Sequence, residues 1–322
     1  MANKYNNGAS DFSVSPCPQD PKSQYEVGLR HFYGQGIRKD EKLSFFWLHK
    51  SAVQGFVEAQ YHVGICYDRG IGVRRSSSLA AKWYRRAATQ GHPLALWGLG
   101  ICYETGEGVH RNLRKAAELY MKAAIKRVAN AQNRLGCLYE KGQGVRQDFK
   151  VAAECYKRAA RRGEINAQNN LGWLYLHGKG VKRDLRRGIA WLTKSARAGN
   201  PDAQCNLGYC YGAGLGVKSN PTLGVYWNRK AADRDDPVAQ CNLGLAYLSG
   251  RGVHRDQKRA ISMFIKAATN GDTEARFNLA RCYWHGVGTK RNRNAALRWA
   301  TRVLGIAFTG LPGNILDANS IV

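Results

Sequence analysis

The sequence contains no hydrophobic run long enough to cross a membrane. No stretch approaches the roughly 18 consecutive apolar residues of a transmembrane helix, and residues 1–21 lack the apolar core of a signal peptide. The only Asn-x-Ser/Thr triplet, Asn220-Pro221-Thr222, carries the proline that blocks glycosylation. These absences predict a cytoplasmic location, with the nucleus as the alternative.

Motifs for catalysis and metal binding are also missing. The sequence has no G-x-x-x-x-G-K-S/T phosphate loop, no H-E-x-x-H and no C-x-x-C, and its eight histidines show no ligand spacing. Its Ser, Cys and His residues show no local pattern of a nucleophile with its base. We therefore expect no metal, no cofactor and no enzymatic activity.

Acidic residues are scarce beside basic ones. The chain has 50 Lys and Arg against 23 Asp and Glu, which gives a formal net charge of +27. Such an excess favours association with nucleic acid, anionic lipid or acidic proteins, but it does not indicate a fold.

What the sequence has in abundance is a repeat of 36 residues. The copy at residues 167–202 opens on Ala167, and the same alanine recurs in the other copies at Ala59, Ala95, Ala131, Ala203, Ala239 and Ala275. A Gly-x-Gly follows in every copy, here as Gly178-Lys179-Gly180. A strict period of this length is typical of a solenoid.

Each copy reads as two helices. In the first helix, small and apolar residues recur along one stripe, namely Ala167, Leu171, Gly172 and Tyr175. The Gly-x-Gly then ends this helix. The second helix begins after a residue that caps helices well in every copy: Asp40, Ser76, Asn112, Asp148, Asp184, Asn220, Asp256 and Asn292. We expect the two helices to approach each other most closely at Gly172.

The pattern A-x-x-x-L-G-x-x-Y-x-x-G-x-G-V-x-x-D, followed by W-Y and K-A-A, resembles the Sel1-like repeat family, a relative of the tetratricopeptide repeat. The resemblance covers residues 23–304 in about eight copies. It implies an all-α fold, a right-handed α-solenoid of about eight 36-residue helical hairpins, that serves as an adaptor for protein complexes. Residues 1–22 then form a disordered N-terminal arm, and residues 305–322 form a C-terminal cap or tail.

Some positions depart from the family pattern. Ala280 replaces the first glycine, and Arg127 and Asp235 replace the glycine that closes the second helix. One cysteine-rich branch of the family ties each hairpin with a disulfide. Here only Cys137 and Cys155 occupy matching helices, so we expect free, reduced thiols.

The resemblance also implies where a partner binds, because peptides lie along the concave face of related solenoids, which the first helices line. We predict a partner-binding set at the places on these helices that lie off the core stripe: Tyr61, Asp68, Trp97, Glu104, Asn133, Glu140, Asn169, Trp173, Tyr209, Phe277 and Trp284. Aromatic side chains with a few acids and amides suit a peptide groove. The alternative for each residue is burial against the neighbouring first helix.

Basic residues follow the Gly-x-Gly of each copy. With repeats stacked about 10 Å apart, they would form a basic ridge along one edge, made of Arg74, Arg75, Arg111, Arg146, Lys182, Arg183, Lys218, Arg255, Lys290 and Arg291. The leading hypothesis is a non-enzymatic adaptor that binds a protein through its concave face. The alternative is a basic solenoid that binds nucleic acid or an anionic surface through this ridge.

Overall fold

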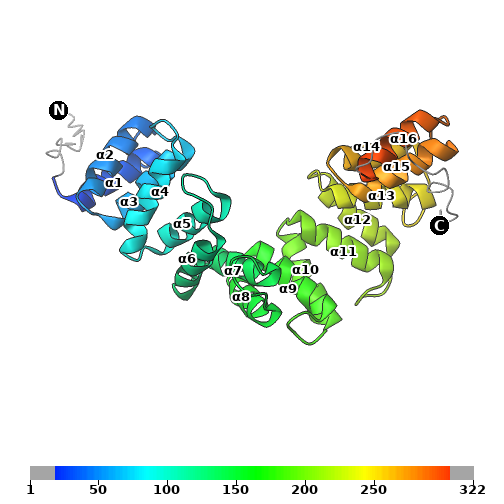
Figure 1. Ribbon diagram of the computed structural model, residues 1–322, viewed down its shortest axis with the longest axis horizontal. Helices are drawn as coiled ribbons and strands as arrows, with labels where there is room; N and C mark the ends of the chain where they lie inside the picture. The colour runs from blue at the N-terminus through cyan, green and yellow to red at the C-terminus, as the bar shows by residue number, and fades with distance from the viewer. Residues whose placement is uncertain (1–18, 305–322) are drawn as a thin grey trace, which may run out of the picture. The chain divides into compact units, whose positions relative to one another are not determined.

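The computed structural model describes residues 19–304, which form sixteen α-helices in two compact units divided between Gln147 and Asp148. In each unit, successive helices alternate in direction and stack as hairpins (Figure 1). The first unit holds α1 (Pro21–Tyr33), α2 (Glu41–Val53), α3 (Val57–Arg69), α4 (Ser77–Thr89), α5 (Pro93–Thr105), α6 (Leu113–Ile125) and α7 (Ala129–Lys141). The second holds α8 (Phe149–Arg161), α9 (Ile165–His177), α10 (Leu185–Arg197), α11 (Pro201–Ala213), α12 (Pro221–Ala232), α13 (Pro237–Ser249), α14 (Gln257–Thr269), α15 (Thr273–His285) and α16 (Arg293–Leu304).

The predicted terminal segments fall almost wholly outside the described residues. Helix α1 begins at Pro21, just inside the predicted arm of residues 1–22. Residues 1–18 and the predicted cap or tail at 305–322 are not described.

The predicted caps of the second helices are confirmed. Each of the eight residues accepts a hydrogen bond from a backbone N–H in the first turn that follows it, as Asp184 does from Arg187 at 2.9 Å and Asn292 from Ala295 at 2.9 Å. These bonds satisfy amide groups that have no partner within the helix. The start of every second helix is therefore encoded locally.

The core stripe and the close approach at Gly172 are also confirmed. Leu171 and Leu192 are fully buried. A Cβ atom at Gly172 would lie 2.9 Å from Leu192 Cγ and 3.0 Å from the carbonyl oxygen of Gly188, so only glycine fits. In the first unit, Gly64 and Gly100 face the rings of Tyr84 and Tyr120 in the same way, with a Cβ 2.5 Å from ring carbons.

The departure at Ala280 has a packing reason. Its methyl group occupies the place of the glycine, and Ala280 packs in one buried cluster with Ala296 and Ala300 of α16. Ala300 stands where the other repeats carry the larger residues Leu, Tyr, Asn or Phe. A smaller partner on the second helix makes room for the larger residue on the first.

The second glycine of the Gly-x-Gly has a role that the sequence did not reveal. A Cβ at Gly180 would overlap the carbonyl oxygen of Phe149, at the start of the preceding second helix, α8. Gly108 stands in the same relation to Ser77 of α4. Gly36, in the first repeat, has no atom within 4 Å of such a Cβ because no repeat precedes it in the described chain. The motif therefore joins neighbouring repeats as well as ending the first helix.

A buried glutamine makes a second link between repeats, which the sequence reasoning missed. Gln204 donates through Nε2 to the carbonyl of Ala196 at 3.0 Å, and Gln132 donates to Ala124 at 3.0 Å. In each case the acceptor lies in the last turn of the preceding second helix, where carbonyl groups lack helical partners. The recurring Gln directly after the opening alanine was the available signal.

Candidate interaction surfaces

The predicted partner-binding residues lie on the first helices of the hairpins. These are α3, α5 and α7 in the first unit and α9, α11 and α15 in the second. We call the surface that they outline in each unit its first-helix face. Tyr209 is the most open of them, at 61% exposure. The following are half-buried: Tyr61, Asp68, Trp97, Glu104, Glu140, Trp173, Phe277 and Trp284.

Two predicted residues, Asn133 and Asn169, are buried instead, at 7% and 8% exposure. Asn169 accepts a hydrogen bond through Oδ1 from Asn206 Nδ2 of the next first helix, α11, at 3.0 Å. Burial against the neighbouring first helix, the alternative considered from the sequence, therefore applies to Asn169. We leave both residues out of the proposed surface because a partner could not reach them.

One acid of the first unit, Glu104, has a structural role. Tyr120 is fully buried, and its hydroxyl donates to Glu104 Oε2 at 2.5 Å. Arg134 Nη1 lies 3.5 Å from Glu104 Oε1, and the Glu104 side chain is 23% exposed. Burial and the Glu104 carboxylate raise the pKa of the Tyr120 phenol. The acid thus accepts the hydrogen bond of a buried hydroxyl. Without an acceptor, burial of this hydroxyl would cost about 1–3 kcal/mol.

The same pairing explains where the acids occur. Within the first unit, the repeats with Asp68 and Glu104 at this place carry a tyrosine on the second helix, Tyr84 and Tyr120 respectively. Burial raises the pKa of Tyr84, with the charge of Asp68 as the next cause. Repeats with Leu192 or Phe264 on the second helix have leucine in place of the acid. Core packing therefore accounts for the acid at Glu104.

Aromatic rings of the second unit lie beside cations of the same chain. Trp173 stacks on His177 with ring centroids 4.3 Å apart, and Lys179 Nζ lies 4.6 Å from the Trp173 ring and 5.3 Å from the Phe149 ring. Arg281 lies 5.9 Å from the ring of Phe277. Such contacts are stabilised by the negative face of the ring. They also cover part of each ring.

An open place adjoins Tyr209 on α11. Gly212 has no atom within 4 Å of the position of a Cβ, although it lies in a helix and is half-buried. Its carbonyl accepts from Arg251 Nη2 at 2.8 Å, which brings the turn after α13 to this place. In the preceding and following repeats, the residues equivalent to Gly212 are leucines: Leu176 is buried and Leu248 packs against the core.

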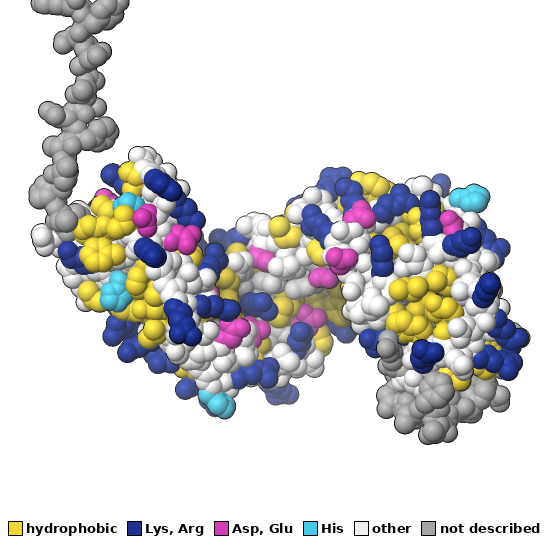
Figure 2. All heavy atoms as spheres, turned by 90° about the horizontal axis from the view of Figure 1, so that it is seen from above, with side chains coloured by type: hydrophobic (Ala, Val, Ile, Leu, Met, Phe, Trp, Pro, Cys, Tyr) yellow, Lys and Arg dark blue, Asp and Glu magenta, His cyan; other side chains and the backbone are white. Residues whose placement is uncertain are grey.

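The ten residues of the predicted basic ridge are all exposed. Half of them have a structural role: Arg75, Arg111, Arg183, Arg255 and Arg291 each donate through Nε to a carbonyl near the end of the first helix, at 2.9–3.1 Å. The others, Arg74, Arg146, Lys182, Lys218 and Lys290, make no hydrogen bond or ion pair that the described residues reveal. Lys and Arg are also spread widely over the visible surface rather than gathered at one edge (Figure 2).

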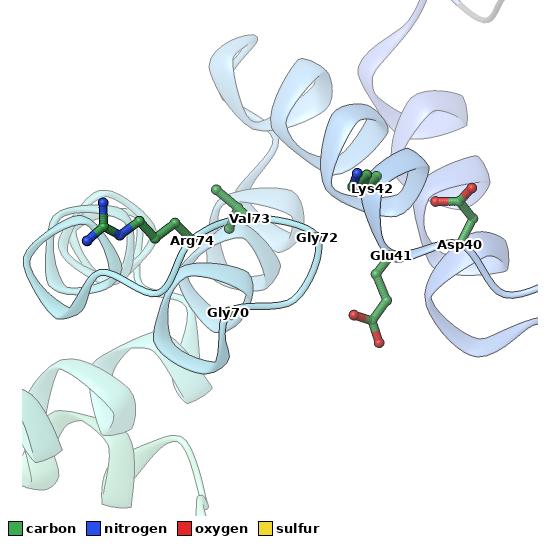
Figure 3. A pocket seen from close by; sticks show the side chains of 7 residues that line it. All are labelled: Asp40, Glu41, Lys42, Gly70, Gly72, Val73 and Arg74. Atoms are coloured by element: carbon green, nitrogen blue, oxygen red, sulfur yellow. The ribbon is translucent and has the colours of Figure 1, made fainter.

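A hollow of about 470 Å³ lies where the turn after α3 meets the start of α2. Asp40, Glu41 and Lys42 line one side and Gly72 lines the other, while Arg74 extends away from α2 (Figure 3). Acids and cations share its rim, so the hollow favours neither anions nor cations. We read it as part of the contact between repeats.

Two further properties concern residues 19–304 only. No group of three or more His, Cys, Asp or Glu among them could hold a metal ion. None of their helices is long and apolar enough to span a bilayer.

Stacked helical hairpins of this kind define an all-α repeat protein of the solenoid class. The chain belongs to the Sel1 repeat family. The family profile matches eight consecutive segments: residues 21–56, 57–92, 93–126, 129–164, 165–200, 201–236, 237–272 and 273–302. Sel1 repeat proteins generally act as protein-interaction scaffolds and are typically non-catalytic.

Two solved structures show the likeness along most of the chain. A Sel1 repeat protein from Oxalobacter formigenes is 30% identical, with a TM-score of 0.67, over 89% of this chain and 84% of that one. The protein c5321, a protective antigen present in uropathogenic Escherichia coli strains, is 29% identical, with a TM-score of 0.66, over 88% of this chain and 68% of its own. No curated protein matches the sequence.

Proposed function

We propose that this chain is a non-enzymatic scaffold that binds a protein partner through its first-helix faces. The observation that carries the proposal is the exposure of Tyr209, a large aromatic residue that is 61% open beside the unfilled place at Gly212. Aromatic side chains that become buried in a complex dominate the binding energy of most interfaces. Tyr61, Trp97 and Trp284, half-buried on other first helices, extend the same kind of surface within their own units.

The basic ridge supports the alternative function less well. Half of its residues are held by carbonyl groups of their own repeat, so their presence has a local cause. Nucleic-acid binding is therefore the alternative that the experiment below distinguishes from protein binding. It would reveal itself by steep weakening with salt, since phosphate contacts release counterions.

The test compares Tyr209→Ala with Tyr226→Ala. Tyr226 lies on the second helix α12 and is 48% exposed, so it matches Tyr209 in residue type and openness but not in face. Each full-length variant is immobilised, and proteins captured from the cells that produce the chain are quantified by mass spectrometry, with and without nuclease. Thermal melting confirms that each variant is folded.

We expect one or more proteins to be lost with Tyr209→Ala and kept with Tyr226→Ala. An affinity loss of about thirtyfold, equivalent to about 2 kcal/mol, is typical of an interface anchor. Lys182→Glu with Lys218→Glu, on the ridge, should change affinity little. The proposal is wrong if both tyrosine variants capture the same proteins, or if capture depends on the ridge and disappears with nuclease.

A further inference from the structure

We infer that the first-helix face of the second unit receives an acidic segment of the partner, in which carboxylate side chains flank an apolar one. The inference rests on the proposed function and specifies the chemistry of the partner at this face. It comes from the distribution of charge on the first helices and from the shape of the surface around Tyr209.

The charge on the two faces differs at matching places of the repeat. The places compared are the second, sixth, ninth and twelfth residues after the opening alanine. In the repeats that begin with α9, α11, α13 and α15, none of them is Asp or Glu, and the charged ones are Lys179, Arg251 and Arg281. At these places an approaching segment meets positive charge and no carboxylate, which attracts acidic side chains and repels Lys and Arg. The acids of these repeats lie instead at the N-terminal ends of the first helices: Glu164, Asp202, Asp236, Asp272 and Glu274.

The unfilled place on α11 suits an apolar side chain. A Cβ at Gly212 would meet nothing within 4 Å, and Tyr209 stands beside it on the same helix. The Arg251 guanidinium reaches the carbonyl of Gly212 with one of its N–H groups. Because a guanidinium carries five N–H donors, the others can bind a carboxylate that follows the apolar side chain.

The rings on this face are poorly placed for bases of a nucleic acid. A single-stranded nucleic acid binds through bases that stack on open aromatic faces. Trp173 already stacks on His177 and lies under Lys179, and Phe277 lies under Arg281. Tyr209 alone is left widely open, which fits one apolar anchor better than a row of stacked bases.

The test selects peptides from a phage-displayed random library on the immobilised full-length chain at physiological salt. The face variant carries Lys179→Glu with Arg281→Glu. The control carries Arg186→Glu with Lys258→Glu, two exposed residues on the second helices α10 and α14. Both variants change the net charge equally, so non-specific attraction to the basic chain cancels. Thermal melting checks that both are folded.

We expect the unchanged chain and the control to enrich peptides that combine Asp or Glu with Phe, Tyr, Trp or Leu. The same peptides, once synthesised, should bind the face variant at least about tenfold more weakly, and they should also lose affinity with Tyr209→Ala.

Four outcomes would overturn the inference. The acidic peptides could lose affinity equally for the face variant and for the control. The unchanged chain could also select basic peptides. A single-stranded oligonucleotide could also bind more tightly than any peptide and depend on Lys179 and Arg281. If no peptide is selected while capture of proteins still depends on Tyr209, the acidic segment is wrong but the scaffold function stands. Loss of that capture would remove the scaffold function itself.

Discussion

In the first unit, Tyr120 fills the space opposite Gly100 and donates its hydroxyl to Glu104. In the second unit, Phe264 fills the space opposite Gly244, and Leu248 packs against the core cluster that contains it. The two hairpins have the same shape, but one contains a buried polar pair and the other is apolar throughout at this contact.

The difference shows that the core partly determines the chemistry of the surface. Glu104 is needed by the hydroxyl beneath it, yet its carboxylate remains 23% exposed on the first-helix face. Where phenylalanine replaces tyrosine, no acid is needed and the face loses its negative charge. A change of residue in the second helix therefore changes the charge that a partner meets on the first.

The largest expected effect tests the shape that both units share. Gly100→Leu and Gly244→Leu should each destabilise their unit by about 3 kcal/mol or more, because the new side chain would overlap a buried ring. Chemical denaturation measures the free energy of unfolding, and hydrogen exchange locates the loss in one unit.

The control for this prediction is Gly212→Ala. Gly212 lies in a helix with open space around it, so alanine should stabilise by about 0.5–1 kcal/mol. Equal destabilisation by all three substitutions would mean that the contact between helices is not what requires glycine at Gly100 and Gly244.

The next effect tests the polar pair itself. Glu104→Leu should cost about 1–3 kcal/mol, because the Tyr120 hydroxyl then stays buried without a partner. Adding Tyr120→Phe should recover most of this loss, since the double variant reproduces the apolar pairing of Phe264 and Leu248. A double-mutant cycle on unfolding free energies measures the coupling.

Tyr120→Phe alone is the reference for that cycle, with an expected cost of about 0.5–1.5 kcal/mol. If Glu104→Leu costs the same with phenylalanine as with tyrosine, the hydroxyl does not need the acid, and the difference between the two units has another origin.

A smaller effect is expected in the pH dependence of folding stability, which should differ between the two units. Burial lowers the pKa of His49, His62 and His92, all in the first unit, and for His62 a hydrogen bond to the Glu58 carbonyl opposes this only partly. Because the unfolded chain, with a histidine pKa of about 6.5, takes up protons first, folding stability falls as the pH drops through that value.

Hydrogen exchange at about pH 7 and about pH 5.5, corrected for intrinsic rates, should show α3 to α5 losing protection first. His62→Gln should reduce this sensitivity. Equal loss of protection in α11 to α13 would show that acid acts on the whole chain rather than through these histidines.

The smallest effect concerns the glycine that usually closes the second helix. Arg127 and Asp235 stand in its place with positive φ, 68° and 60°. Arg127→Gly should stabilise the first unit by about 0.5–1 kcal/mol, since a side chain is strained in this conformation. Asp235→Gly should change the second unit less, because aspartate tolerates the left-handed region. Thermal melting of both variants measures these changes. A lower melting temperature for Arg127→Gly would show that the backbone at Arg127 is not strained.

The sequence alone determined the hairpin, its length and its ends. Asp184 and the equivalent residues cap helices through bonds to amides in the next turn, and the glycine at Gly172 recurs in every repeat but the last, where Ala280 stands. Such signals depend on neighbours a few residues away or on a strict period, so they can be read from the chain itself.

Only the tertiary structure decided which side chains of the first helices remain available. Asn169 and Tyr209 both lie off the core stripe, yet the next first helix covers Asn169 and leaves Tyr209 open. Glu104 stands on the same face because Tyr120, on the adjacent helix, needs an acceptor. Burial and hydrogen bonding depend on what the neighbouring helix brings to each place, and periodicity within one helix does not carry that information.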